Sequence, residues 1–287
     1  MTFGHIPSAA FPFLLAVLLL SEPLHCQTTA TSLSDDASCK VERGITVALL
    51  GDSITWLGGD DCKGEKGWSR YFVEEMGEKV SLCRSYARSG ATWTNTPSTV
   101  RDTKSVSGKL DNNNVIYNQV CRLVDDVKIG SMATPDVIMI AAGINDIWFL
   151  RSRPQALSRT PEEAFAFSGT SFITGSAPGE ILSLAWAVRY NCELLMEAFP
   201  DAQIVLLTPS QCTKVPYATL TQACDIIEGC ARRMALGVIR LDRCSSVYSI
   251  REGISAHSTY DGVHTSSEGA RRNGVLIANA LRSMLQK

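Results

Sequence analysis

The sequence predicts an α/β fold with a five-stranded, mainly parallel sheet covered by helices. Two observations lead to this prediction: five short apolar runs, and helical stretches between them. The apolar runs show no clear polar–apolar alternation, which is typical of strands buried on both faces. A regular alternation of strands and helices favours a parallel sheet with right-handed crossovers and helices on both faces.

Each strand is predicted from a short, mainly apolar run. Ile45 to Leu50 ends at Gly51, and Val137 to Ala142 ends at Gly143. The other strands are predicted at 80–83, 204–207 and 238–241. Helices are predicted at about 68–78, 115–128, 180–198, 221–235 and 266–286. The last of these has apolar residues largely at helical spacing, and Ser266 or Ser267 is a suitable N-cap.

The N-terminal part of the chain differs from the rest. Phe11 to Leu20 is an apolar run that is too short for a bilayer span, which needs ~20 residues. It fits the apolar core of a signal peptide, although residues 1–10 contain no Lys or Arg. We therefore expect export, with a signal peptide at 1–26, a polar tether at 27–42 and one folded domain at 43–287. Cys26 is a candidate for lipid attachment and membrane anchoring. The alternative to a signal peptide is a buried or disordered N-terminal hydrophobic segment.

Bulk composition excludes some classes of function. The chain has 287 residues, 45% hydrophobic and 20% charged, with a net charge of -2. Because it has no basic field, we do not expect nucleic-acid binding. Ten cysteines are present without a CxxC pair, so a structural zinc site is not predicted. Export permits disulfides, but spacing leaves the pairing open, and some cysteines can be core residues.

The first predicted strand leads directly into Gly51-Asp52-Ser53. A serine at this place opens the next helix, where its backbone N–H lies at the positive helix end and suits a developing oxyanion. Gly51 permits the tight turn. The alternative interpretation is that Asp52 or Ser53 is only a helix N-cap.

Asp261 and His264 stand three residues apart just before the last helix. A serine hydrolase needs a base for its hydroxyl and an acid that orients the imidazole, and this spacing can place both side chains on one side of a turn. Of the four histidines, His5 and His25 lie in the predicted signal segment, and His257 has no carboxylate other than Asp261 at a comparable spacing. The alternative is a capping Asp beside a surface His.

Two further segments offer hydrogen-bond donors. Asn145, in the Gly143–Asp146 segment after the third strand, can donate a side-chain N–H to an oxyanion. Gly90, after the second strand, can donate its backbone N–H with no side chain in the way. Each also fits an ordinary turn.

These four segments, in this order and context, resemble the SGNH (GDSL) hydrolase family: 51–53, Gly90, 143–146 and 261–264. The resemblance covers about residues 45–286 and implies a flavodoxin-like three-layer α/β/α sandwich. It implies a catalytic triad of Ser53 as nucleophile, His264 as base and Asp261 as the orienting acid. It also implies an oxyanion hole formed by Ser53 N–H, Gly90 N–H and the Asn145 side chain. The implied acyl-enzyme mechanism needs no cofactor and no metal ion.

The substrate is less sharply predicted. Two polar stretches, 91–114 and 149–178, follow strands at the sheet edge where open α/β sheets bind ligands. The candidate substrate contacts are Trp56, Trp93, Asp146 and Trp148, with Phe149 beside them. Aromatic faces there can stack on sugars, or they can pack under the loops.

The polar loops favour a short acyl group, acetyl in particular, on a small-molecule or carbohydrate ester. Two alternatives stay open. One is a lipase or lysophospholipase with an apolar cleft beside Ser53. The other is a non-catalytic carbohydrate-binding protein on the same fold, against which the complete set of Ser53, Asp261 and His264 argues. A GxSxG motif is absent, which argues against an α/β-hydrolase.

Overall fold

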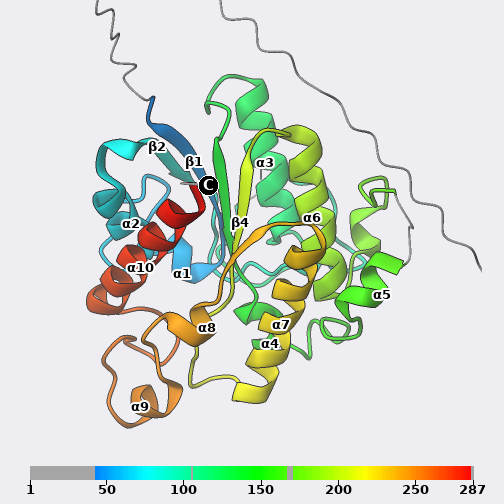
Figure 1. Ribbon diagram of the computed structural model, residues 1–287. Coiled ribbons are helices and arrows are strands. Elements are labelled where there is room, and N and C mark those ends of the chain that lie inside the picture. The colour runs from blue at the N-terminus through cyan, green and yellow to red at the C-terminus, as the bar shows by residue number, and fades with distance from the viewer. Residues whose placement is uncertain (1–42, 105, 167–170, 286–287) are drawn as a thin grey trace, which may run out of the picture. The chain divides into compact units, whose positions relative to one another are not determined.

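A wholly parallel five-stranded sheet forms the centre of the fold (Figure 1). The computed structural model describes residues 43–285 except 105 and 167–170, so the predicted signal peptide and tether lie outside the described residues. The strand order β2-β1-β3-β4-β5 is the flavodoxin-like order, which confirms the predicted fold class. The strands are β1 Ile45–Gly51, β2 Val80–Ser85, β3 Val137–Ala141, β4 Gln203–Leu207 and β5 Gly237–Ile239.

The central strands β1, β3 and β4 send alternate side chains into two separate apolar cores. On one face, Leu50 and Ile140 pack with α3 (Ile116–Lys128), α6 (Leu184–Ala198) and α7 (Tyr217–Arg233). On the other face, Leu49 and Met139 pack with α2 (Trp68–Met76) and α10 (Ser267–Leu285). Figure 1 shows these two helical layers on opposite sides of the sheet. Burial on both faces is the physical reason for the uninterrupted apolar runs.

Helix boundaries follow local capping chemistry. The predicted helix at 180–198 begins only at Leu184, because the Ser183 hydroxyl accepts the Trp186 N–H at 3.4 Å and caps the helix there. A 3₁₀ turn, Pro178–Glu180, precedes it. In contrast, α7 starts at Tyr217, four residues earlier than predicted, directly after Pro216.

Short helices follow three of the strands: α1 (Ser53–Trp56) follows β1, α4 (Ile144–Trp148) follows β3, and α8 (Leu241–Cys244) follows β5. Two of them, α1 and α4, carry predicted site residues. The remaining short helices are α5 (Pro161–Ala166), α9 (Ser249–Ile254) and the 3₁₀ turn Gly77–Lys79. Because the strands are parallel, the residues that follow them gather at one edge of the sheet. None of the helices among residues 43–285 is both long and apolar enough to span a bilayer.

Candidate active site

Ser53, His264 and Asp261 form a continuous chain of hydrogen bonds. His264 Nε2 lies 2.9 Å from Ser53 Oγ, and His264 Nδ1 lies 2.6 Å from Asp261 Oδ2. Ser53 and His264 are 211 residues apart in the sequence, so the fold itself brings them together. A proton on Nδ1 leaves Nε2 free to accept the serine proton, which is the arrangement that a general base requires.

The carboxylate of Asp261 is held in its charged form. Burial opposes ionisation, but hydrogen bonds from the His264 side chain and from the backbone N–H groups of His264 and Val263 outweigh it. The pKa of Asp261 therefore lies below its usual range. The backbone N–H groups of Val263 and His264 donate to Oδ1 at 2.9 Å and 2.8 Å respectively, which leaves Oδ2 for the imidazole.

A tight turn presents Asp261 and His264 on the same side. Thr259 and Thr265 pair as an antiparallel bridge, and the Tyr260 N–H donates to the His264 carbonyl at 3.0 Å. Gly262 lies within this turn at φ +87°, a conformation that favours glycine. A Cβ on Gly262 would come 2.0 Å from Thr213 Oγ1, so the loop between β4 and α7, which carries Thr213, packs directly against the turn.

Glu252 in α9 anchors the segment that enters this turn, a role that the sequence did not reveal. Its buried carboxylate accepts the backbone N–H groups of residues 257–259 at 3.0 Å each and the Thr259 hydroxyl at 2.7 Å. Although burial opposes ionisation, these hydrogen bonds lower the pKa of Glu252 to about 2. The entry to the histidine turn is therefore fixed by a charged group at neutral pH.

The nucleophile turn is fixed from two sides. Asp52 is the N-cap of α1, and its Oδ1 accepts the Ile54 N–H at 3.0 Å, so the capping interpretation holds for Asp52 while the Ser53 hydroxyl faces His264. Gln119 in α3 clamps Gly51: the Gly51 N–H donates to Oε1, and Nε2 donates to the Gly51 carbonyl, both at 2.8 Å. Gln119 is fully buried, and its role was not predicted.

Burial also changes the acidity of the residue beside the nucleophile. Desolvation, assisted by the nearby Asp146 carboxylate, raises the pKa of Asp52 to about 7, although the Ile54 N–H opposes this shift. Asp52 therefore changes its charge near neutral pH, one residue from Ser53.

Gly90 lies in a strained turn that only glycine suits. Its φ is +77°, and a Cβ would come 2.7 Å from the Leu110 backbone nitrogen. The Asn114 side chain holds this turn by donating to the carbonyls of Ser89 and Lys109 at 2.7 Å and 2.8 Å.

Asn145 joins the Gly90 turn to α4. Its side-chain Nδ2 donates to the Ala91 carbonyl at 2.8 Å, and this uses one of its two N–H bonds. Within the described part of the chain, neither the Ser53 N–H nor the Gly90 N–H donates to a protein acceptor. Ser53 and Gly90 thus keep free backbone donors, and Asn145 keeps a second N–H, which suits an oxyanion.

Three of the four predicted substrate contacts are buried or packed on the core. Trp93 is fully buried and donates from Nε1 to the Ala142 carbonyl at 3.1 Å, so its ring faces are closed to a sugar. Asp146 is fully buried as well and accepts the N–H groups of Trp93 and Thr94 at 3.0 Å and 2.8 Å. Trp148 is half-buried, packs on the core and stacks on Phe149. These residues hold the loop after β2 in place.

The exposed aromatic residues beside the triad are Trp56 and Tyr260. Trp56 lies three residues after Ser53 and is 43% exposed. The Tyr260 ring stacks on the His264 imidazole at 5.8 Å with 18° between the planes. The Lys66 ammonium group lies over the Tyr260 ring, 4.5 Å from the ring centre. Sequence patterns singled out Trp56 but not Tyr260 or Lys66.

The first residues of the loop after β2 turn their polar side chains inward. Thr92, Thr94 and Asn95 are buried and bond to neighbouring loop groups. Their polarity therefore satisfies acceptors in the loop itself, in α4 and at Pro178, and it does not by itself describe a groove beside Ser53.

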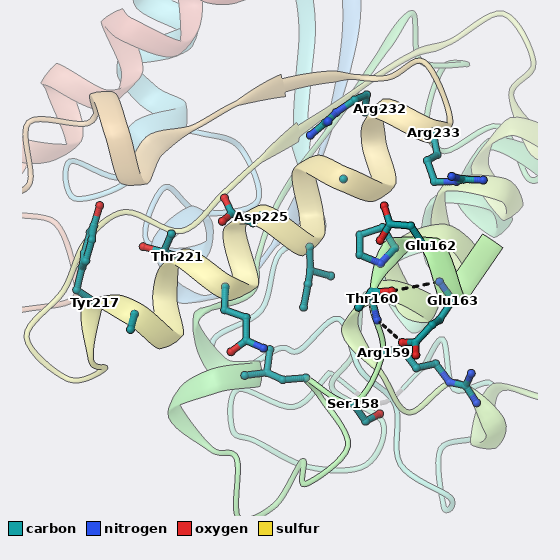
Figure 2. A pocket seen from close by; sticks show the side chains of 16 residues that line it. Ser158, Arg159, Thr160, Glu162, Glu163, Tyr217, Thr221, Asp225, Arg232 and Arg233 are labelled. Carbon is teal, nitrogen blue, oxygen red and sulfur yellow. Dashed lines mark hydrogen bonds between the residues drawn. The ribbon is translucent and has the colours of Figure 1, made fainter. Parts of the chain in front are cut away.

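A large cavity lies apart from these groups. It has a volume of about 1150 Å³, between the 157–163 segment and α7, and Ser158, Arg159, Tyr217 and Arg233 are among its lining residues (Figure 2). None of the triad residues lines it. Among the described residues, no cluster of His, Cys, Asp and Glu side chains is arranged to hold a metal ion.

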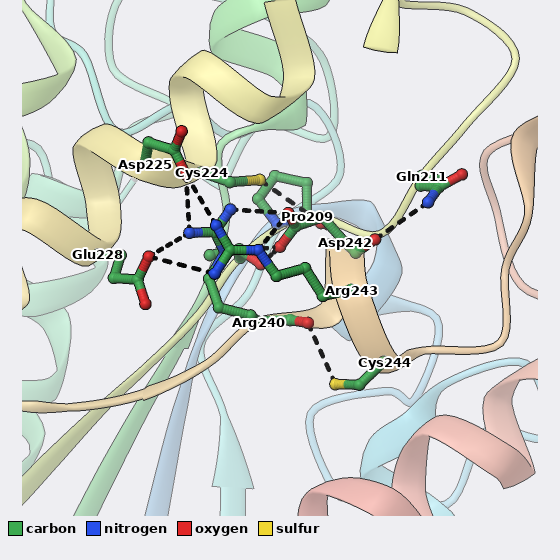
Figure 3. A network of polar contacts seen from close by, with 10 residues as sticks. Pro209, Gln211, Cys224, Asp225, Glu228, Arg240, Asp242, Arg243 and Cys244 are labelled. Atoms are coloured by element: carbon green, nitrogen blue, oxygen red, sulfur yellow. Dashed lines mark hydrogen bonds and ion pairs between the residues drawn. The ribbon is translucent and has the colours of Figure 1, made fainter. Parts of the chain in front are cut away.

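A buried charge network fixes the ends of β4 and β5 (Figure 3). Arg240 donates to both oxygens of Asp242 at 2.8 Å, and it also contacts Asp225 and Glu228 in α7. The Thr208 hydroxyl, at the end of β4, donates to Asp242 at 2.8 Å. Burial raises the pKa of Asp242, but the hydrogen bonds from Arg240 and Thr208 outweigh burial and lower it. The network anchors the start of the loop between β4 and α7, in which Thr213 packs against Gly262 of the histidine turn.

The fold and the family match together make this chain a carboxylic ester hydrolase. Residues 49–272 match the GDSL-like lipase/acylhydrolase family, and the chain belongs to that family. The family prediction from the four motifs is therefore confirmed. Searches of curated proteins give no match.

Solved structures show the same fold. A carbohydrate acetylesterase from Sinorhizobium meliloti is 17% identical, with a TM-score of 0.52 over 84% of this chain and 99% of that chain. An acetyl xylan esterase is 19% identical, with a TM-score of 0.50 over 84% of this chain and 100% of that chain. At these identities the likeness establishes the fold.

Proposed function

We propose that this protein is an exported serine esterase that hydrolyses short-chain carboxylic esters, in particular acetyl esters of carbohydrates. The hydrogen-bond chain from Asp261 through His264 to Ser53 carries the proposal. It supplies a nucleophile, a base and a carboxylate that orients the base. Membership of the GDSL-like lipase/acylhydrolase family supports ester bonds as the target.

The reaction proceeds in two half-reactions. His264 Nε2 removes the Ser53 proton as Oγ attacks the ester carbonyl carbon, and the oxyanion is stabilised by the N–H groups of Ser53, Gly90 and Asn145. His264 returns the proton to the leaving alcohol, and the acyl group stays on Ser53. Water, deprotonated by His264, then attacks the acyl-enzyme, and the carboxylic acid leaves as Ser53 recovers its proton.

Two observations support a short acyl group on a carbohydrate. The similar structures named above are described as a carbohydrate acetylesterase and an acetyl xylan esterase. The exposed groups beside the triad are Trp56 and Tyr260, with Lys66 on the Tyr260 ring. Aromatic rings with a polar neighbour suit a sugar better than a long acyl chain.

Hydrolysis of p-nitrophenyl esters from acetate to octanoate tests the substrate class. We expect acetate to be hydrolysed fastest, turnover to fall by octanoate, and Ser53→Ala to lower kcat by roughly 10⁴-fold or more. Ser98→Ala, at an exposed loop serine, is the matched control and should behave like wild type. A preference for octanoate would favour a lipase, and Ser53-independent turnover would contradict the proposed nucleophile.

Export is proposed from the apolar run at 11–20 and the polar segment that follows it. Expression of the full chain with sequencing of the released protein tests it, since a mature N-terminus near residue 26 is expected. A lipid-sized mass increase on Cys26 would show anchoring instead of release. Retention of the uncleaved chain inside the cell would contradict export.

A further inference from the structure

Two cysteines outside the triad lie in direct contact. The sulfur atoms of Cys62 and Cys83 are 3.4 Å apart, although 21 residues separate them in the sequence. Cys62 lies in the loop 57–67 between α1 and α2, and Cys83 lies in the edge strand β2. Among the eight cysteines in the described part of the chain, no other pair has its sulfur atoms in such contact.

Separate hydrogen bonds hold this loop against β2. The Ser85 N–H donates to the Asp60 carbonyl at 2.9 Å, and Arg88 pairs with the Asp60 carboxylate at 2.7 Å. Cys62 itself has φ +60°, which is unfavourable for a residue with a side chain, so the surrounding contacts impose its conformation. The two thiols are therefore kept together by groups other than their own sulfur atoms.

The surroundings of the pair suit a neutral cross-link. Cys62 is buried in the apolar core beside α2 and α10, and Cys83 packs against the same core. A disulfide has no hydrogen to donate, so it buries there without an unsatisfied donor. To reach the S–S bond length of about 2.05 Å, the sulfur atoms need to approach by roughly 1.4 Å.

We propose that Cys62 and Cys83 form a disulfide bond in the mature protein. The oxidant is a small or protein-borne disulfide such as oxidised glutathione. The Cys62 thiolate attacks one sulfur of the oxidant, which leaves a mixed disulfide and releases one thiol. The Cys83 thiolate then attacks the Cys62 sulfur and releases the second thiol, so two cysteines are oxidised and one external disulfide is reduced.

Cys62 is the better attacking group of the two. A hydrogen bond from Cys83 lowers the pKa of Cys62 more than burial raises it, whereas the pKa of Cys83 is raised. Since the thiolate is the nucleophile, exchange starts at the cysteine with the lower pKa.

The cross-link would fix a loop that supports the histidine turn. Lys66 lies in the same loop. Its backbone carbonyl accepts a hydrogen bond from the Thr265 hydroxyl at 2.7 Å, and its side-chain ammonium group lies over the Tyr260 ring. A disulfide from Cys62 to Cys83 in β2 closes the chain between residues 62 and 83 into a ring. This restricts the unfolded state of that segment.

Mass spectrometry of the full chain, purified without reductant, tests the proposal. The protein is denatured in N-ethylmaleimide and digested with trypsin. We expect the Cys62 peptide linked to the Cys83 peptide, and neither cysteine alkylated. Complete alkylation of both, even after incubation with oxidised glutathione, would overturn the proposal, as would a link from either one to another cysteine.

Urea unfolding with and without dithiothreitol gives a second readout. The midpoint of the wild type should fall on reduction, whereas the midpoint of the Cys62→Ser/Cys83→Ser double variant should not respond. Cys244→Ser, at an exposed cysteine, is the matched control and should respond to reductant like wild type. Equal midpoints of wild type with and without reductant would contradict the cross-link. Both readouts are independent of esterase activity, so they separate this proposal from the proposed function.

Discussion

Replacing Gln119 by leucine tests whether one buried amide holds the nucleophile turn in place. Gln119 makes two hydrogen bonds to Gly51, each 2.8 Å long, from a fully buried position in α3. Leucine has a similar volume and fills the same space, so the variant removes both hydrogen bonds without opening a large cavity.

The two lost bonds differ in cost. The Gly51 carbonyl also accepts the Arg88 N–H at 3.1 Å and keeps that partner, whereas the Gly51 N–H is left with none. An unsatisfied buried donor costs about 1–3 kcal/mol, and the other lost bond adds about 1 kcal/mol. We therefore expect the free energy of unfolding to fall by roughly 2–4 kcal/mol. Because the Ser53 hydroxyl loses its fixed position, kcat should fall roughly tenfold or more.

Urea unfolding and hydrolysis of p-nitrophenyl acetate measure both effects. Gln155→Leu, at an exposed glutamine, is the matched control and should change stability by less than about 0.5 kcal/mol. Gln119→Glu adds a pH test, because a protonated carboxyl can make both hydrogen bonds. Burial raises the pKa of such a carboxyl, so stability should be near wild type below about pH 4 and fall as the pH rises above it. An unfolding free energy for Gln119→Leu within 1 kcal/mol of wild type, with unchanged kcat, would refute the clamp.

Three further predictions follow from the geometry. Arg240→Ala leaves the buried Asp242 carboxylate without its cation, so the free energy of unfolding in urea should fall by roughly 3–5 kcal/mol. Arg243→Ala, at a half-exposed side chain, is the control and should lower it by less than about 1 kcal/mol. Equal losses of stability in the two variants would contradict the network. Burial raises the pKa of Asp52 to about 7, so protonated Asp52 stabilises the fold fully below about pH 4, and this contribution is lost as the pH rises towards 7. Asp52→Asn still caps α1 but does not titrate, so the free energy of unfolding should depend less on pH between about pH 4 and 8. An unchanged pH dependence would contradict the raised pKa. Gly90→Ala places a Cβ at a position with positive φ and close backbone neighbours, so kcat should fall. Gly77→Ala is the control, because φ is also positive there (+59°) but nothing lies within 4 Å of the added Cβ, and kcat should fall far less. Similar kcat values in the two variants would contradict a tight turn at Gly90.

The fold was predictable because its central strands are buried on both faces. Runs such as Val137–Ala141 have no polar interruption, and each helix between them has an apolar side. Boundaries were less predictable where a single side chain decides them. The Ser183 cap moves the start of α6 from the predicted 180 to Leu184, and an apolar pattern does not record such a cap.

Short-range motifs predicted the site where spacing along the chain fixes geometry. Asp261 and His264 share one turn, so their pairing follows from a three-residue spacing. Long-range partners carry no such signal: Gln119 lies 68 residues from Gly51 in the middle of a helix. Trp93 was expected to face substrate because it lies three residues after Gly90, but its ring is buried and its Nε1–H donates to the Ala142 carbonyl.

Covalent labelling of Ser53 tests the central claim most directly. The protein is treated with a fluorophosphonate, which forms a stable phosphonyl ester with an activated serine, and the adduct is located by mass spectrometry of tryptic peptides. We expect one adduct per chain, on Ser53, absent in Ser53→Ala and formed far more slowly in His264→Ala. An adduct on another serine, or equal labelling rates in wild type and His264→Ala, would contradict a nucleophile activated by His264.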